Sequence, residues 1–75
     1  MKNETLGMRI RKRRKELKLT QETLAKKLGL QGGSISQWED DKTKPNGSNM
    51  LSLAQALGCS PEFIMYGENS ASNVE

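Results

Sequence analysis

Residues 20–39 have the sequence TQETLAKKLGLQGGSISQWE, and they decide the fold because they carry the signals for two short helices joined by a tight turn. Apolar residues in the first half recur at the spacing that places them on one helix face. Gly29 follows directly, where the end of a helix favours a residue that tolerates positive φ. An apolar pair at i, i+3 in the second half predicts a helix that packs against the first. The apolar positions of the two predicted helices are Leu24, Ala25, Leu28, Ile35 and Trp38.

The outward positions of the second of these helices are short or carry amides, and no acidic residue occurs before Glu39. Such a surface suits polar contacts with a ligand. In a helix-turn-helix, the second helix enters the DNA major groove, and its N-terminal half contacts base edges. The sequence therefore indicates a helix-turn-helix whose outward positions are Gln31, Gly32, Ser34, Ser36 and Gln37.

Length and composition exclude several classes of protein. The 75 residues suffice for one domain, and a single Cys without any His excludes an intrachain disulfide and argues against a zinc site. The cysteine has no neighbouring base and no carboxylates are paired in an apolar setting, so we expect no enzyme, no metal and no cofactor. No apolar run approaches the ~20 residues of a membrane span, and the polar N-terminus does not look like a secretory leader. These features predict a reduced, cytoplasmic setting.

The net charge of +3 is distributed unevenly along the chain. Residues 1–19 hold eight of the twelve basic residues, and the remainder is net acidic. A basic N-terminal helix favours a polyanionic partner. The alternative, which charge alone leaves open, is a solvated helix face.

A first helix is predicted over residues 4–18, where apolar residues recur in a narrow stripe. Arg13 and Arg14 flank this stripe, and a charge at the margin of a core is costly unless it is paired. We therefore expect one of these arginines to meet a carboxylate. Glu39 is the best candidate because it is next to Trp38, a predicted core residue.

Thr20 is a favoured N-cap for the next helix, which is predicted over residues 21–28. Gln21 and the free backbone N–H groups of that first turn suit a phosphate oxygen, although Gln21 could instead support the cap. The third helix has a weak start near Gln31 or Gly32, because Gln31 is not a favoured cap and glycine costs roughly 1 kcal/mol inside a helix. Either this end frays without a ligand, or the glycines allow the backbone to approach the groove closely.

The stretch after the third helix predicts a loop followed by a fourth helix. Lys42, Lys44 and Asn46 follow the third helix closely, where the backbone of a bound duplex would pass. A plain solvated loop is the alternative. The fourth helix is predicted over residues 49–57, with Ser48 as its N-cap.

The fifth helix has the clearest start, because a serine N-cap is followed by a proline at the first helical position. Four apolar or aromatic residues follow, and one core cannot bury every side of so short a helix, so part of this set is expected to form an interface. Residues 68–75 predict a flexible tail or linker, which leaves residues 1–67 as the folded domain. The expected contact between two copies comprises Pro61, Phe63, Ile64, Met65 and Tyr66.

At these residues the chain resembles the lambda-type phage repressor and Cro family, also called Xre-like. The resemblance extends over about residues 4–67 and depends on the segments RIRKRRKELKLTQ, LAKKLG, SISQWE, TKPNG and CSPEFIMYG. It implies an all-α, five-helix DNA-binding domain with the helix-turn-helix at residues 20–39. It also implies a phosphate contact for Gln21 and a base contact, often with adenine, for Gln37. A buried ion pair between Arg14 and Glu39 is implied as well, together with contacts of Lys44 and Asn46 with the DNA backbone.

The sequence departs from this family at Gly32 and Gly33, where relatives often carry base-contacting side chains. Only backbone is available at these two positions, so specificity would depend on the neighbouring polar residues and on DNA shape.

The function that the sequence favours is sequence-specific binding of double-stranded DNA by a repressor that acts as a dimer on a palindromic operator. One alternative is an antitoxin-type autoregulator, which would use the apolar residues of the fifth helix to hold a different protein. Another is a module that binds only proteins. Such a module should display large apolar side chains on the outward face of residues 31–37, where this chain has small and polar ones.

Overall fold

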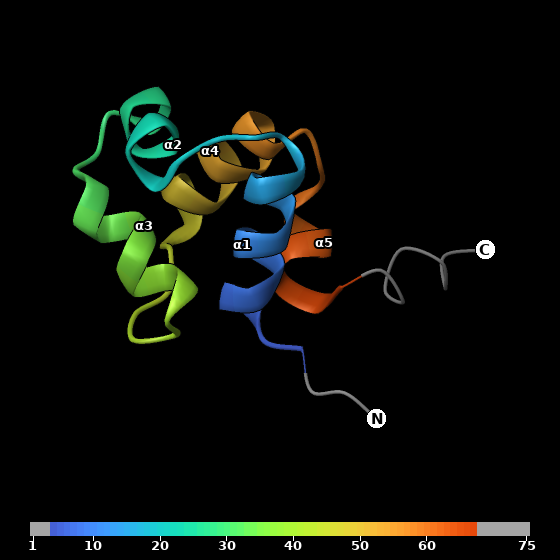
Figure 1. Ribbon diagram of the computed structural model, residues 1–75. Coiled ribbons are helices and arrows are strands. Elements are labelled where there is room, and N and C mark those ends of the chain that lie inside the picture. The colour runs from blue at the N-terminus through green and yellow to red at the C-terminus, as the bar shows by residue number, and fades with distance from the viewer. Residues whose placement is uncertain (1–3, 68–75) are drawn as a thin grey trace.

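A computed structural model describes residues 4–67 of the chain. The predicted tail and the outer boundaries of the domain therefore lie outside the described residues. Within the described range, all regular structure is helical, which confirms the prediction of an all-α domain with five helices (Figure 1). The helices are α1 Leu6–Glu16, α2 Gln21–Leu28, α3 Gly32–Glu39, α4 Gly47–Leu57 and α5 Pro61–Tyr66.

The core collects apolar side chains from all five helices. α3 packs against α1 and α2, while α5 packs against α1 and α4, so that α1 lies between α3 and α5 (Figure 1). None of the helices in the described part of the chain is both long and apolar enough to cross a bilayer. The buried apolar residues are Ile10, Leu24, Ala25, Ile35, Trp38, Met50, Leu53, Ala54, Leu57 and Ile64.

Local signals explain where α2 begins and ends and where α5 begins. The Thr20 side chain accepts a hydrogen bond from the Thr23 N–H at 2.9 Å, and the Ser60 side chain accepts one from the Phe63 N–H at 3.1 Å. Gly29 adopts φ 71°, as expected for the left-handed residue that ends α2. These caps satisfy backbone groups that the helices leave free at their ends.

Two predicted helix boundaries were wrong. The N-cap of α4 is Asn46 and not Ser48, because the Asn46 Oδ1 accepts from the Asn49 N–H at 2.8 Å. Helix α1 is shorter than residues 4–18, since the Thr5 side chain caps its start and Lys18 has φ 60°, which is incompatible with a right-handed helix.

Candidate nucleic-acid interface

The outward surface of α3 is polar and uncharged. Gln31, Gly33 and Gln37 are exposed, while Ser34 and Ser36 are partly buried. The opposite side of the helix faces the core through buried Ile35 and Trp38. The helix-turn-helix therefore presents the predicted amide and hydroxyl side chains on the side that the core does not use.

The first turn of α3 contains two glycines that the fold does not require. Neither has a positive φ. A Cβ at Gly33 would have no neighbour within 4 Å, and one at Gly32 would meet only the Glu22 side chain, at an ordinary contact distance of 3.5 Å. Gln31 makes no side-chain cap, which agrees with the weak start predicted for this helix. This end of α3 consequently offers backbone to a ligand with no side chain in between.

The ion pair expected at the core margin is present between Arg14 and Glu39. Arg14 Nε donates to Glu39 Oε2 at 2.6 Å, and a second guanidinium nitrogen donates to Oε1 at 3.0 Å. The third nitrogen donates to the Leu19 carbonyl at 2.8 Å. Both residues are 8% exposed, and the hydrogen bond to Glu39 raises the pKa of Arg14 above its ordinary value. The pair joins α1 to the C-terminal end of α3.

Gln21 belongs to the same network. Its Nε2 donates to Glu39 Oε1 at 3.0 Å, while Thr20 makes the α2 cap with its own hydroxyl. Gln21 is therefore not needed for the cap, and its role within the domain is to bind the buried carboxylate. An amide NH₂ has two hydrogens, so one remains available for a ligand at the start of α2.

The loop after α3 places on the surface the two lysines that are predicted to contact the DNA backbone. Lys42 and Lys44 are both exposed, whereas Pro45, which lies between them and α4, is buried. Asn46 is also exposed, but its side-chain oxygen is occupied by the α4 cap. A DNA contact by Asn46 would have to use its amide nitrogen or its backbone.

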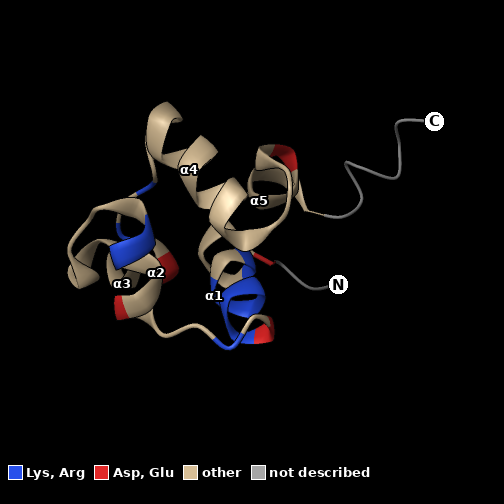
Figure 2. Cartoon of the chain, turned by 90° about the horizontal axis from the view of Figure 1, so that it is seen from above, with Lys and Arg blue, Asp and Glu red and all other residues tan. Residues whose placement is uncertain are grey.

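Much of the basic character of α1 serves the fold. Figure 2 shows the concentration of basic residues on this helix. Arg9 donates to the carbonyls of Ile64 at 2.8 Å and Met65 at 2.7 Å, near the end of α5. Arg13 donates to the Leu57 carbonyl at 2.8 Å, at the end of α4. These two arginines stabilise the C-terminal ends of two helices, so the charge count of α1 overstates the charge available to a polyanion.

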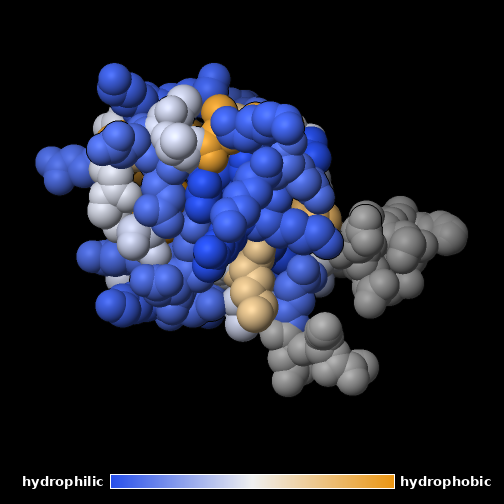
Figure 3. Space-filling model, viewed as in Figure 1, coloured by the Kyte–Doolittle hydropathy of each residue, from blue (hydrophilic) through white to orange (hydrophobic). Residues whose placement is uncertain are grey.

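The predicted dimer contact needs one correction. Ile64 is fully buried and belongs to the core, so it cannot form part of a contact surface. Pro61 and Phe63 are partly buried, whereas Met65 and Tyr66 are exposed at 36% and 64%. The face in Figure 3 is largely hydrophilic, with hydrophobic colour only in small separate areas.

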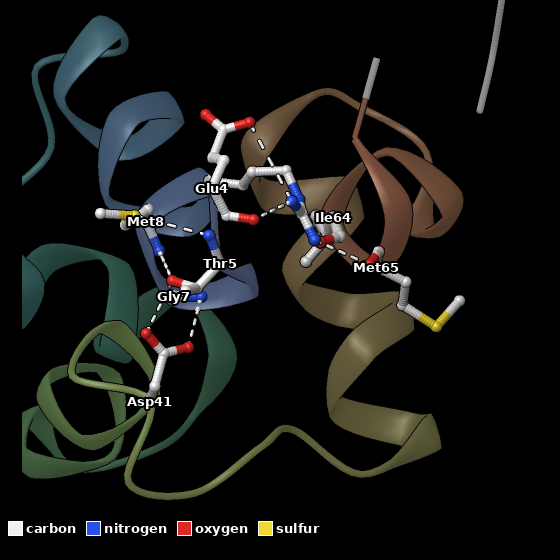
Figure 4. Close-up of polar contacts among 8 residues, drawn as sticks. Glu4, Thr5, Gly7, Met8, Asp41, Ile64 and Met65 are labelled. Atoms are coloured by element: carbon white, nitrogen blue, oxygen red, sulfur yellow. Dashed lines mark hydrogen bonds and ion pairs between the residues drawn. The ribbon is translucent and has the colours of Figure 1, made fainter. Parts of the chain in front are cut away.

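The role of Asp41, which follows α3, was not predicted from the sequence. Its carboxylate accepts hydrogen bonds from the Thr5 hydroxyl at 2.7 Å and from the Gly7 N–H at 2.9 Å (Figure 4). A glycine within the otherwise long side chains of α1 was the available signal, because it marks a point where another segment approaches the helix closely.

Comparison with known proteins places this geometry in a family. A family model described as helix-turn-helix matches residues 10–64. Repressor protein C2 of Salmonella phage P22 is 47% identical over 74 residues, which cover 99% of this chain and 34% of that protein. The transcriptional regulator DicA of Escherichia coli K12 is 49% identical over 67 residues, or 89% of this chain and 50% of DicA. The chain thus spans a third to a half of the length of these relatives.

The fold also matches a solved protein–DNA complex. The P22 c2 repressor, crystallised with synthetic operator 9T, superposes with a TM-score of 0.86 at 47% identity. The match covers 88% of this chain and 100% of the repressor chain in that crystal.

Proposed function

The chain belongs to the helix-turn-helix family, and we propose that it is a transcriptional repressor that binds double-stranded DNA in a sequence-specific manner. In this proposal, two copies bind a palindromic operator, and each places α3 in the major groove. The outward face of α3 is the observation that carries the proposal, because its exposed positions between residues 31 and 37 carry amides and no acidic or large apolar side chain. The likeness to a repressor solved on its operator supports the same assignment.

The proposed contacts divide into two groups by what they touch. Gln37 is the main base-contacting residue, because an exposed amide can pair bidentately with adenine N6 and N7. Phosphate contacts come from Gln21 at the start of α2 and from Lys42 and Lys44 in the following loop, where they fix the position of the protein on the duplex. The remaining groove contacts are assigned to Gln31, Gly32, Gly33, Ser34 and Ser36.

The proposed dimer uses the exposed end of α5. Met65 and Tyr66 are the members of the predicted contact that are more than one-third exposed. A dimer with two-fold symmetry matches half-sites about one helical turn apart. A repressor acts where its DNA is, so the proposal includes a cytoplasmic location.

A function confined to protein binding has less support. Protein interfaces depend on buried aromatic or aliphatic side chains, and the exposed positions of α3 provide none. An antitoxin-type autoregulator would share the DNA contacts and differ only in the partner of α5.

Selection of bound duplexes from a random pool, at about physiological salt, tests the proposal because non-specific phosphate binding is weak under that condition. We expect a palindrome to be enriched. Replacement of Gln37 by alanine should relax the preference at one base pair of each half-site and cost about 1–3 kcal/mol. Gln55→Ala, at an exposed amide on α4, is the matched control and should leave the selected sequence unchanged. A failure of the native chain to enrich any sequence would refute the proposed function.

A further inference from the structure

Asp41 occupies a backbone conformation that usually belongs to glycine. Its φ is 60°, and it is the left-handed residue that ends α3. The helix end is closed by two hydrogen bonds, from the Asp41 N–H to the Trp38 carbonyl at 3.1 Å and from the Lys42 N–H to the Gln37 carbonyl at 2.9 Å. Glycine is favoured at this position, and aspartate is among the few other residues that tolerate it. Unlike a glycine, Asp41 also places a carboxylate at this helix end.

That contribution is a second helix cap, at a distant point in the sequence. The two carboxylate oxygens of Asp41 accept from the Thr5 hydroxyl and the Gly7 N–H, at the start of α1 (Figure 4). The first turn of α1 contains no acidic residue of its own. A carboxylate from the loop after α3 thus supplies the negative charge that a helix N-terminus favours. We call Thr5, Gly7 and Asp41 the Asp41 latch.

The Asp41 latch lies beside a close backbone contact between the start of α1 and the end of α3. A Cβ at Gly7 would lie 2.5 Å from the carbonyl oxygens of both Trp38 and Glu39. The N-terminal end of α1 is thereby seated directly on the C-terminal carbonyls of α3, and the partial charges of the two ends are opposite. Two contacts therefore join the end of α3 to α1: the exposed Asp41 carboxylate binds the Gly7 N–H, and the buried Glu39 pairs with Arg14.

The position of Asp41 has a cost for DNA binding. The residue is exposed, it precedes Lys42 directly, and it lies three positions before Lys44. A negative charge beside these lysines opposes the attraction of phosphates. Its removal should raise affinity for any duplex unless the carboxylate also does something that DNA recognition needs.

We propose that Asp41 is a positioning residue for sequence recognition: its latch to α1 fixes the end of α3 and the Lys42–Lys44 loop in the orientation that engages the operator. The inference rests on the proposed function and adds to it a residue that does not contact DNA. It predicts that loss of a repulsive charge weakens specific binding.

The experiment compares Asp41→Asn with Asp40→Asn by fluorescence anisotropy, on the selected duplex and on a scrambled duplex of equal composition. Asparagine tolerates positive φ and preserves size, but it removes the charge and can no longer accept from both donors. Within residues 4–67 the exposed Asp40 carboxylate has no hydrogen-bond partner, so this neighbour is a matched charge control. Asp40→Asn should raise affinity for both duplexes and leave their ratio unchanged. Asp41→Asn should lower the ratio of specific to non-specific affinity by roughly tenfold, as expected when a charged hydrogen bond is lost.

A second variant separates positioning from general damage to the fold. Asp41→Gly retains the left-handed end of α3 and relieves its strain, yet it removes the carboxylate. With all variants compared below their melting temperatures, it should reproduce the loss of preference seen with Asp41→Asn. If both variants keep the native ratio, as Asp40→Asn is expected to do, the latch has no role in recognition and the inference is overturned. A native chain without any preference would overturn the proposed function itself, and the role of Asp41 with it.

Discussion

Replacement of Arg14 by methionine tests the ion pair that joins α1 to α3. The substitution retains much of the apolar length of the side chain but removes three hydrogen bonds, two to Glu39 and one to the Leu19 carbonyl. Glu39 has a side chain that is only 3% exposed, and its remaining partner is the Gln21 amide at 3.0 Å. The variant therefore buries a carboxylate without a cation.

The expected loss is large compared with the stability of so small a domain. Removal of one partner from a buried ion pair costs about 3–5 kcal/mol. At roughly 0.05–0.15 kcal/mol per residue, a domain of this size has an unfolding free energy on the order of 4–11 kcal/mol. Each 1 kcal/mol shifts the melting temperature of such a domain by about 4–8 °C, so we expect a decrease of at least about 12 °C.

Circular dichroism during thermal and urea unfolding measures the effect. Arg11→Met is the matched control because Arg11 is exposed on the same helix, and it should change the unfolding free energy by less than about 0.5 kcal/mol. The double variant Arg14→Met, Glu39→Leu should recover part of the loss, since it removes the unpaired charge. A melting temperature for Arg14→Met within about 2 °C of the native value would refute the reasoning, because removal of one partner of a buried ion pair must lower the unfolding free energy by more than that shift represents.

Other predictions follow from the loop, the glycines and the cysteine. Lys44→Ala should weaken binding to all duplexes alike and flatten the salt dependence by about one unit, and a loss confined to the operator would contradict a phosphate contact. Gly7→Ala should destabilise the fold by about 1–3 kcal/mol because its Cβ meets backbone carbonyls. Gly33→Ala should be neutral or stabilise the fold by up to about 1 kcal/mol. Equal melting temperatures for these two variants would disprove the close approach at Gly7. Burial raises the pKa of the Cys59 thiol, so iodoacetamide should alkylate the native chain more slowly than the urea-unfolded chain near pH 8. Equal alkylation rates would show that the fold does not protect the thiol. The same raised pKa stabilises the fold below the ordinary thiol pKa, and this contribution is lost as the pH rises through the raised value.

The parts of the fold that the sequence predicts well are those with short-range causes. A cap residue, a glycine at a helix end and an apolar pair at i, i+3 act within one or two turns of chain. This is why the helix-turn-helix, the Thr20 cap and the left-handed Gly29 were all predictable. The outward face of α3 follows from the same periodicity, because the positions outside the apolar stripe are the ones that face away from the core.

The errors arise where two local solutions are equally good. Asn46 and Ser48 are both favoured caps, and the choice of Asn46 starts α4 at Gly47, two residues earlier than predicted, without a change in periodicity. Ile64 shares an apolar run with exposed Met65 and Tyr66, and only the direction of α5 against α1 and α4 decides which of them enters the core.

Charge is the property for which sequence reasoning was least informative, and the three arginines of α1 show why. Arg9, Arg13 and Arg14 lie within six residues and would count equally in any charge tally. In the fold, the first two bind carbonyls at the ends of α5 and α4, and the third is buried against Glu39. Asp41 has the opposite ambiguity, because an acid in a basic loop suggests a poor DNA contact although its carboxylate holds α1 to the end of α3. Whether a charge serves a ligand or the fold depends on partners that are 25 to 56 residues away, and only the tertiary structure brings those partners together.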